Sequence, residues 1–424
     1  MSTSASMPNQ RPNYAFALGV IGTLFFIFGF ITWANGSLIP YLKIACELTT
    51  AQSFYVASAF FASYFIMAIP SSYILKKVGF KNGMSLGLFV MAIGAIIFIP
   101  AANARSYPLF LTGLFVIATG LTLLQTASNP YVTVLGPLES AARRISIMGI
   151  CNKVAGIVSI YILSGIILKN ADAFEANLKT LSGAAKEEAL DSLAARVIEP
   201  YIIIAIAFAI LAIVIFFLKL PDIQEEKEGT EITHSEEKKS IFQFPHLLLG
   251  AIAIFFYVGV EVISYDSFAN FGQSVGYSLD TAKTFATYTG YALVLGYLLG
   301  IALIPKTLSQ RKALIISVML SMVLVVLAIM TKGMVAVVCF ALLGFSNAIM
   351  WPAIWPLAME GLGKFTKIGA ALLIMGIVGG AVLPPLYGKL ADAIDSKQTA
   401  YWIMIPCYLY ILYFATSGYK VGKK

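Results

Sequence analysis

Two ionisable residues, Glu261 and Lys153, stand inside long apolar stretches of the sequence, FYVGVEVISYDS and MGICNKVAG. An ionisable group inside an apolar segment is costly and marks a candidate functional site. A carboxylate there can take up a proton, or stay ionised and hold Na⁺ with neighbouring oxygens. The structural alternatives are an ion pair between the two, or snorkelling of Lys153 toward a helix end. Asp266 follows Glu261 but, at about 100° per residue, falls on a different face, so the two need not form one site. It also lies nearer the headgroups, which makes it the weaker candidate.

Amide side chains form a second group. Gln125 and Asn129 lie four residues apart in GLTLLQTASNPYVTVLGP and therefore share one face of a helix. An amide buried in lipid without a partner is costly, so both must face protein or a wet cavity. They either bind ligand hydroxyls or join neighbouring helices. Asn152, beside Lys153, is a further amide of this kind.

A third group lies in GFSNAIMWPAIWPLAM, where Asn347, Trp351 and Trp355 recur at i, i+4 and i+8. This spacing predicts one amide and two indoles on a single helix face. Indoles stack on the apolar C–H faces of pyranose rings, and amides bind ring hydroxyls, so the face suits a neutral sugar. Packing is the more common role of aromatic residues. The chain has only four tryptophans, however, and two of them on this face favour binding.

The composition places these residues in a membrane protein. The 424 residues are 59% hydrophobic and 12% charged, whereas soluble domains carry about 25% charged residues. Apolar windows such as 202–218 and 313–330 are long enough to cross a bilayer. We therefore predict an all-α membrane protein with twelve transmembrane helices. Their expected positions are near 15–41, 50–75, 82–102, 107–135, 145–168, 198–218, 246–271, 281–304, 312–331, 334–358, 366–387 and 401–418.

No motif indicates an enzyme or a cofactor site. Both histidines, His234 and His246, lie in or beside a polar segment at mid-chain, and HExxH, GxSxG and Walker sequences are absent. The four cysteines are far apart, which argues against a disulfide framework or a zinc site. The net charge of +8 does not indicate nucleic-acid binding here, because in a membrane protein the positions of Lys and Arg are what matters. Their bias predicts that both termini are cytoplasmic.

The charged segment KLPDIQEEKEGTEITHSEEKKSIFQFPH divides the chain. We expect an N-terminal six-helix half over 1–218, a cytoplasmic linker over 219–245 and a C-terminal six-helix half over 246–424. IMGI occurs at 147–150 and again at 374–377, and the same offset carries Asn35 to the neighbourhood of Glu261. Parallel halves that contain inverted repeats are the pattern of the major facilitator architecture, whose substrate site lies at the bilayer midplane. Residues 170–197 are expected to form an external loop with a short surface helix.

Several stretches of the sequence are similar to one known family. They are FFIFGFITWANGSLIPYLK, GLTLLQTASNPYVTVLGP, RRISIMGICNK, FYVGVEVISYDS and MWPAIWPLAMEGLGKFTKIGAALLIMGIVGGAVLPPLYG. They resemble the fucose/galactose/glucose permease family of the major facilitator superfamily, in its bacterial glucose/galactose branch. The resemblance covers nearly the whole chain and implies cation-coupled sugar uptake across a bacterial inner membrane. It also matches Asn152 to a family asparagine in the sugar cavity.

One departure from the family bears on the coupling ion. The fucose permease pattern has an acid just after the asparagine that matches Asn35, and another at the position of Gln125. This chain has Gly36 and Gln125 there. The glucose/galactose branch shares both changes and shares Glu261, so the resemblance implies that coupling has moved to Glu261. The branch is similar to both proton-coupled and sodium-coupled glucose carriers, and the coupling ion stays open.

We therefore predict a monomeric secondary transporter, without a cofactor, that imports a neutral hexose of the glucose or galactose type by alternating access. The expected sugar site consists of Asn35, Gln125, Asn129, Asn152, Asn347, Trp351 and Trp355. Glu261 is the expected coupling group for H⁺ or Na⁺, with Lys153 as its partner and Asp266 as a second acid. An uncoupled facilitator is the alternative, and a non-transporting sugar receptor or an amphiphile exporter is less favoured. The expected partners are the sugar and the lipid bilayer.

Overall fold

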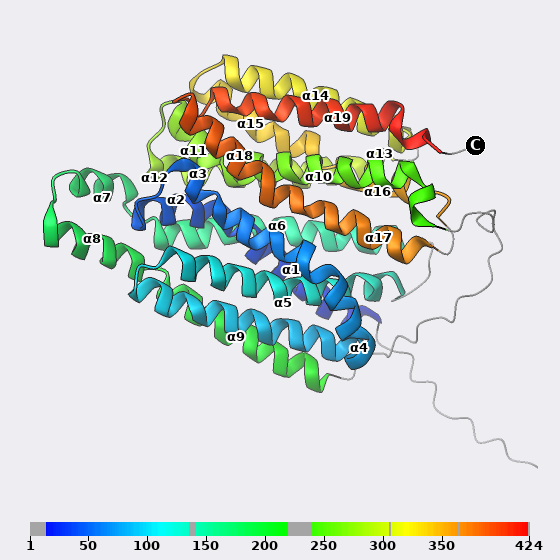
Figure 1. Cartoon of the computed structure of the whole chain (residues 1–424), viewed down its shortest axis with the longest axis horizontal. Coiled ribbons are helices and arrows are strands. Elements are labelled where there is room, and N and C mark those ends of the chain that lie inside the picture. Colours follow the sequence, from blue (N-terminus) through cyan, green and yellow to red (C-terminus); the bar gives the residue numbers. More distant parts are fainter. Residues whose placement is uncertain (1–13, 135–140, 219–239, 305–306, 363–364, 423–424) are drawn as a thin grey trace, which may run out of the picture.

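The computed structural model describes residues 14–134, 141–218, 240–304, 307–362 and 365–422. Within these ranges all regular secondary structure is helical (Figure 1). The predicted all-α class is therefore confirmed. The predicted linker, 219–245, lies outside the described residues as far as residue 239.

The first part of the chain forms the helices α1 to α9. Their bounds are α1 (Tyr14–Trp33), α2 (Asn35–Ala45), α3 (Thr50–Ser53), α4 (Tyr55–Asn103), α5 (Tyr107–Val134), α6 (Ala141–Ile167), α7 (Ala171–Leu178), α8 (Gly183–Ala195) and α9 (Ile198–Phe217). The polar segment 170–197 contains two short helices, α7 and α8, where one was expected. Most helix bounds lie within a few residues of the predicted ones.

The second part begins after the linker. Its helices are η2 (Ile241–Gln243), α10 (Pro245–Asp266), α11 (Phe268–Ser274), α12 (Leu279–Ala282), α13 (Ala286–Leu303), α14 (Gln310–Met330), α15 (Gly333–Asn347), α16 (Met350–Met359), α17 (Thr366–Met375), η4 (Gly376–Val378), α18 (Gly379–Ala393), η5 (Thr399–Ile403), α19 (Met404–Thr416) and η6 (Gly418–Lys420). Several predicted single spans are therefore built from two consecutive helices.

Eleven helical stretches among the described residues are long and apolar enough to cross a membrane. One of them, Thr50–Asn103, has 54 residues and is interrupted at Gly79, whose φ is 77°. At 1.5 Å per residue this stretch measures about 80 Å, which is enough to cross a hydrocarbon core of about 30 Å twice. Only a residue without a Cβ adopts this φ readily, so Gly79 allows the reversal. The twelve predicted crossings are accounted for.

Several crossings of the described residues are interrupted along their length, among them the following four. α1 gives way to α2 at Ala34, α10 to α11 at Ser267, α15 to α16 after Asn347, and α17 to α18 through η4. A break leaves backbone groups without their usual helical partners, which inside a membrane is tolerated only against protein or a wet cavity. Discontinuous helices of this kind form the binding sites of many transporters. Three of the four breaks adjoin candidate residues of the sequence, namely Asn35, Asp266 and Asn347.

Helices α1 to α9 pack mainly on one another, and so do helices α10 to α19. The two groups meet through α6 with α13 and through α3 and α4 with α18. In Figure 1 the first group lies below and the second above, with α7, α8 and α12 at the left. We call that side the α8 end. The opposite side, where α9 ends and α10 begins, is the linker end.

Candidate functional site

Lys153 on α6 and Glu261 on α10 form a buried ion pair, with Nζ and Oε1 3.2 Å apart. Their side chains are 9% and 11% exposed. Tyr257, one turn before Glu261 on α10, also interacts with its carboxylate. The pairing considered from the sequence is therefore present. It connects the two groups of helices, and either charge would be left uncompensated without the other.

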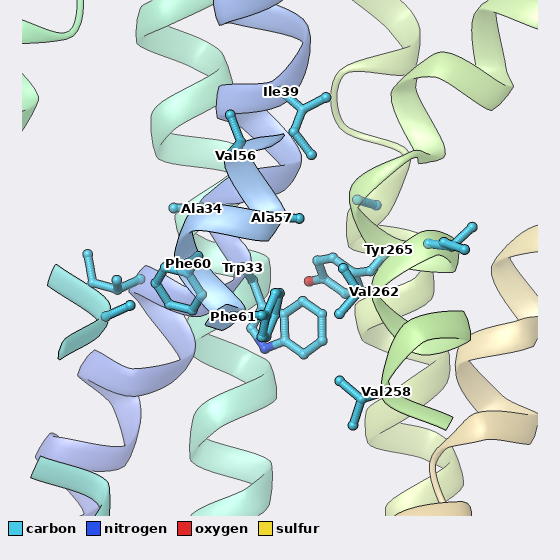
Figure 2. Close-up of a cluster of buried hydrophobic side chains, with 14 of the residues drawn as sticks. Trp33, Ala34, Ile39, Val56, Ala57, Phe60, Phe61, Val258, Val262 and Tyr265 are labelled. Atoms are coloured by element: carbon cyan, nitrogen blue, oxygen red, sulfur yellow. The ribbon is translucent and has the colours of Figure 1, made fainter. Parts of the chain in front are cut away.

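Trp33, the last residue of α1, covers the same ion pair. The Lys153 Nζ lies 4.1 Å from the centroid of the indole ring, within the range of a cation–π attraction. The indole Nε1 donates a hydrogen bond to Oδ1 of Asn152 at 3.3 Å. The ring also contacts Tyr265 of α10, with centroids 4.1 Å apart. Figure 2 shows Trp33 and Tyr265 facing each other among buried apolar side chains.

Two glycines allow α1 and α6 to approach closely enough for these contacts. A Cβ on Gly29 would lie 1.8 Å from the backbone oxygen of Asn152, and a Cβ on Gly156 would lie 2.5 Å from Trp33 Cδ1. Neither clash can be relieved without moving a helix or the indole. Asn152 Nδ2 also donates to the backbone oxygen of Phe25 at 3.5 Å. The position of Asn152 is therefore fixed by α1.

Gln125 lies half-buried on α5, and its Nε2 donates to the hydroxyl of Tyr64 on α4 at 3.1 Å. This bond joins two helices of the first group, as the packing alternative expected. Asn129 belongs to α5, but its side chain lies outside what the structure describes. The face predicted to be shared by Gln125 and Asn129 therefore stays a prediction.

Asn347 is the last residue of α15, and Trp351 and Trp355 lie on α16, which begins at Met350. The single face predicted from the i, i+4, i+8 spacing stays a prediction. Asn347 is fully buried, and its Oδ1 accepts hydrogen bonds from Tyr408 at 3.0 Å and Ser321 at 3.3 Å. Its amide oxygen therefore joins α15 to α14 and α19. Its Nδ2 has no partner among the described residues.

Trp351 and Trp355 are half-buried on α16 and lie against each other, with ring centroids 5.3 Å apart and an interplanar angle of 28°. Trp351 also approaches Tyr257, with centroids 6.3 Å apart. Because Tyr257 interacts with Glu261, the tryptophans connect through one phenol to the buried ion pair. The structure thus brings the predicted indoles and the predicted acid into one cluster.

Asn35 and Asp266 are both buried, with 0% and 2% exposure. Neither amide atom of Asn35 has a hydrogen-bond partner among the described residues, and Oδ1 of Asp266 has none either. Unlike Glu261, Asp266 is not paired with any described cation. Buried polar atoms without partners are rare in folded proteins, so each such atom calls for an explanation.

Sequence reasoning missed the aromatic members of this site. Trp33, Tyr64, Tyr257 and Tyr265 occur in apolar segments where a buried packing role is the ordinary expectation. The sequence offered one sign of an aromatic residue at the site, namely Trp33, because tryptophan is scarce in this chain and Trp33 stands two positions before Asn35. Among the described residues no group of three or more His, Cys, Asp or Glu side chains is arranged to hold a metal ion.

Comparison with known proteins identifies the family. A family model described as "Major Facilitator Superfamily" matches residues 21–384. The chain belongs to this superfamily. It is therefore a multi-pass membrane transporter and not an enzyme, as the sequence predicted.

Curated relatives and solved structures match along the whole chain. A protein of Brucella abortus biovar 1 named "Glucose/galactose transporter" is 38% identical over 416 residues, which are 97% of this chain and 96% of the relative. The "L-fucose-proton symporter" of Escherichia coli K12 is 30% identical over 417 residues, covering 96% of this chain and 94% of the relative. The crystal structure of the superfamily transporter FucP in the outward conformation superposes with a TM-score of 0.70 at 29% identity, covering 95% of this chain and 98% of that one.

Proposed function

We propose that this transporter imports a neutral hexose, of the glucose or galactose type, together with H⁺ or Na⁺. The names of the curated relatives, a glucose/galactose transporter and an L-fucose-proton symporter, support the substrate class and the symport mode. The observation that carries the proposal is the buried pair of Lys153 and Glu261, which joins the two groups of helices. Asn152 and Trp33 meet directly beside it.

Sugar recognition is assigned to amides on one side and indoles on the other. Gln125 and Asn152 are half-buried amides of the first helix group, while Trp351 and Trp355 offer stacked rings from the second. The full proposed set is Asn35, Gln125, Asn129, Asn152, Asn347, Trp351 and Trp355. Asn347 belongs to it only through its unpaired amide nitrogen, because its oxygen is already bound. Such a site satisfies ring hydroxyls by hydrogen bonds and apolar ring faces by stacking.

Ion coupling is assigned to Glu261, with Lys153 as its exchangeable partner and Asp266 as a second acid. An ion gradient can drive transport only through a group whose affinity for the ion differs between conformations. Glu261 meets this condition, because its partner Lys153 belongs to the other group of helices. When the groups separate at this level, the carboxylate needs a proton or Na⁺ in place of the lysine.

The same proposal includes a topology. Residues 1–218 and 246–424 act as two six-helix halves that move against each other about the linker 219–245. The excess of basic residues in the connections at the linker end supports an orientation in which that end, and both termini, are cytoplasmic. The protein is then a monomeric carrier of a bacterial inner membrane, which agrees with the bacterial origin of these curated relatives.

Uptake into proteoliposomes tests this function. Purified protein is reconstituted, and inward gradients of H⁺ and of Na⁺ are imposed in separate experiments with labelled glucose and galactose. One gradient should drive accumulation above the external concentration, and an ionophore for that ion should abolish it. Equilibration without accumulation under both gradients would identify an uncoupled facilitator. Binding of hexose without any entry would identify a receptor.

A further inference from the structure

The two groups of helices are clasped together at the α8 end. The carboxylate of Asp280 accepts hydrogen bonds from the backbone N–H groups of Ala171 and Asp172, both at 3.0 Å. In return, the carboxylate of Asp172 accepts from the N–H groups of Leu279 at 2.8 Å and Asp280 at 3.2 Å. Each aspartate thus caps the first turn of the other's helix, α7 or α12. This end of the transporter is closed in the structure.

Closure buries Asp266 between the two groups of helices. A Cβ built on Gly36 of α2 would lie 3.8 Å from Asp266 Oδ1, so the carboxyl of α10 faces a glycine of the first group. The same Cβ would lie 3.8 Å from Ile160 Cδ1 and 4.0 Å from Ala286 Cβ. The carboxyl therefore shares this space with methyl groups from α6 and α13. At 2% exposure it is shielded from water.

No charge compensates an ionised Asp266 in this position. Neither a hydrogen bond nor an ion pair joins its carboxyl to another described residue, and Oδ1 is without a donor. The nearest interacting charge is Glu261, an acid whose own partner is Lys153. The phenol of Tyr265, the preceding residue of α10, interacts with the carboxyl but is uncharged and cannot balance a negative charge. α2 contributes no charge at this point, because it presents Gly36.

We infer that closure of the α8 end requires a proton on Asp266. This inference deepens the proposed ion coupling and rests on it for its physiological meaning. Opening the α8 end separates α2 from α10 and exposes the carboxyl to water, where it ionises. Closing that end returns it to an apolar space, where only the neutral acid is tolerated. Proton binding and closure are therefore linked, and under the proposed topology the proton comes from outside.

The proton is favoured over Na⁺ by the surroundings of the carboxyl. A hard cation gathers several oxygen ligands. The space beside Gly36 that Asp266 Oδ1 borders is lined by methyl groups of Ile160 and Ala286, which offer a cation no ligand. A proton needs only the carboxylate itself. Asp266 is in this way distinguished from Glu261, whose charge is balanced by Lys153.

The distance between spin labels at the α8 end tests the inference without sugar or transport. Cysteines replace the exposed Glu188 on α8 and Lys332 just before α15, in protein whose native cysteines have been removed. The measurement runs from pH 5 to pH 9, a range of about four units around neutrality. The fraction of molecules at the closed distance should fall as the pH rises. Because closure is linked to one proton, the ratio of closed to open molecules should fall by at most about tenfold per pH unit. Asp266→Asn, a neutral mimic of the protonated acid, should stay closed at every pH.

Matched variants make the result specific. Gly36→Ala should keep the pH response, because its methyl group fits at 3.8 to 4.0 Å from its neighbours. Glu261→Gln should also keep it, which separates this inference from the coupling role proposed for Glu261. Asp266→Ser provides a second neutral variant in case Asp266→Asn does not fold. A pH response that survives in these Asp266 variants would overturn the inference, as would closure of the parent protein by Na⁺ at constant pH.

Discussion

Glu261 and Asp266 lie on the same helix in opposite electrostatic situations. Glu261 is paired with Lys153 across the contact between the helix groups, whereas Asp266 has no described cation beside it. The sequence identified both acids and the lysine, because ionisable residues in apolar segments are conspicuous. It offered the pair of Lys153 with Glu261 as one alternative but did not decide between pairing and snorkelling of the lysine, because that depends on how α6 and α10 approach each other in space. That approach is fixed by glycines and aromatic residues whose sequence signal is weak.

Replacement of Glu261 by glutamine tests its role in coupling. The amide keeps the shape of the side chain but neither takes up a proton nor balances the charge of Lys153. We expect gradient-driven accumulation of hexose in proteoliposomes to be abolished, while sugar binding and counterflow exchange persist at least in part. The variant Glu261→Gln/Lys153→Met, which removes both charges, is the control for a lysine left unpaired. Accumulation that survives in Glu261→Gln would make Glu261 a structural residue.

The amides of the proposed sugar site give a second test at this scale. Gln125→Ala and Asn152→Ala should each weaken hexose binding by about 1 to 3 kcal/mol, or about 5- to 150-fold in Kd, the usual cost of a lost buried hydrogen-bond partner. Binding is measured by calorimetry on purified protein. Ser85→Ala is the control, because its hydroxyl donates to the backbone oxygen of Ala212 on α9 and contacts no described residue of the proposed set. Folded variants that bind hexose with the same Kd as the parent protein would show that the sugar binds elsewhere.

At the scale of the elements, the sequence predicted the crossings well and their interruptions poorly. Hydropathy reports the length of an apolar segment, and the bounds of α5, α6 and α9 differ from the predicted ones by only a few residues. Prolines are poor guides to the breaks, since α4 continues through Pro70 and Pro100. The break at Ala34 involves no proline or glycine at that position. Such breaks depend on packing between helices, which a single sequence does not display.

The contacts at the α8 end repeat between the two halves of the chain. Asp392, at the end of α18, accepts a hydrogen bond from the backbone N–H of Ala51 in α3 at 2.8 Å. Asp172, after α6, does the same for the first turn of α12. In both places an aspartate from one helix group caps a short helix of the other. This correspondence agrees with the internal duplication indicated by the repeated IMGI sequence.

The clasp between α7 and α12 makes a prediction about conformation. Asp280→Asn leaves one acceptor oxygen where the carboxylate bound two N–H groups and Lys283, so closure of the α8 end should weaken. A lost cap costs about 0.5 to 2 kcal/mol, so the ratio of closed to open molecules should fall by about 2- to 30-fold. The distance between labels at positions 188 and 332 measures this ratio. Asp395→Asn, an exposed change at the same end, should leave it unaltered.

At the scale of the whole molecule, polar contacts join the two groups of helices at more than one level. The clasp lies at the α8 end, and the pair of Lys153 with Glu261 lies deeper between the groups. Asp266 stands between these two levels, next to the break that ends α10. An ion that binds there senses the opening of the α8 end directly. The side of the membrane that the α8 end faces then decides where Asp266 takes up its proton, while the gradients of ion and sugar set the direction of net transport.

The orientation of the molecule is the remaining prediction. Lys and Arg concentrate in the connections at the linker end, and such residues are retained on the cytoplasmic side during insertion. A cysteine at Thr230 in the linker should therefore react with an impermeant maleimide only in inside-out vesicles. A cysteine at Glu188 on α8, which is exposed, should react in intact cells and serves as the matched control. The reverse pattern would place the linker outside, and Asp266 would then exchange its proton with the cytoplasm whenever the α8 end opens.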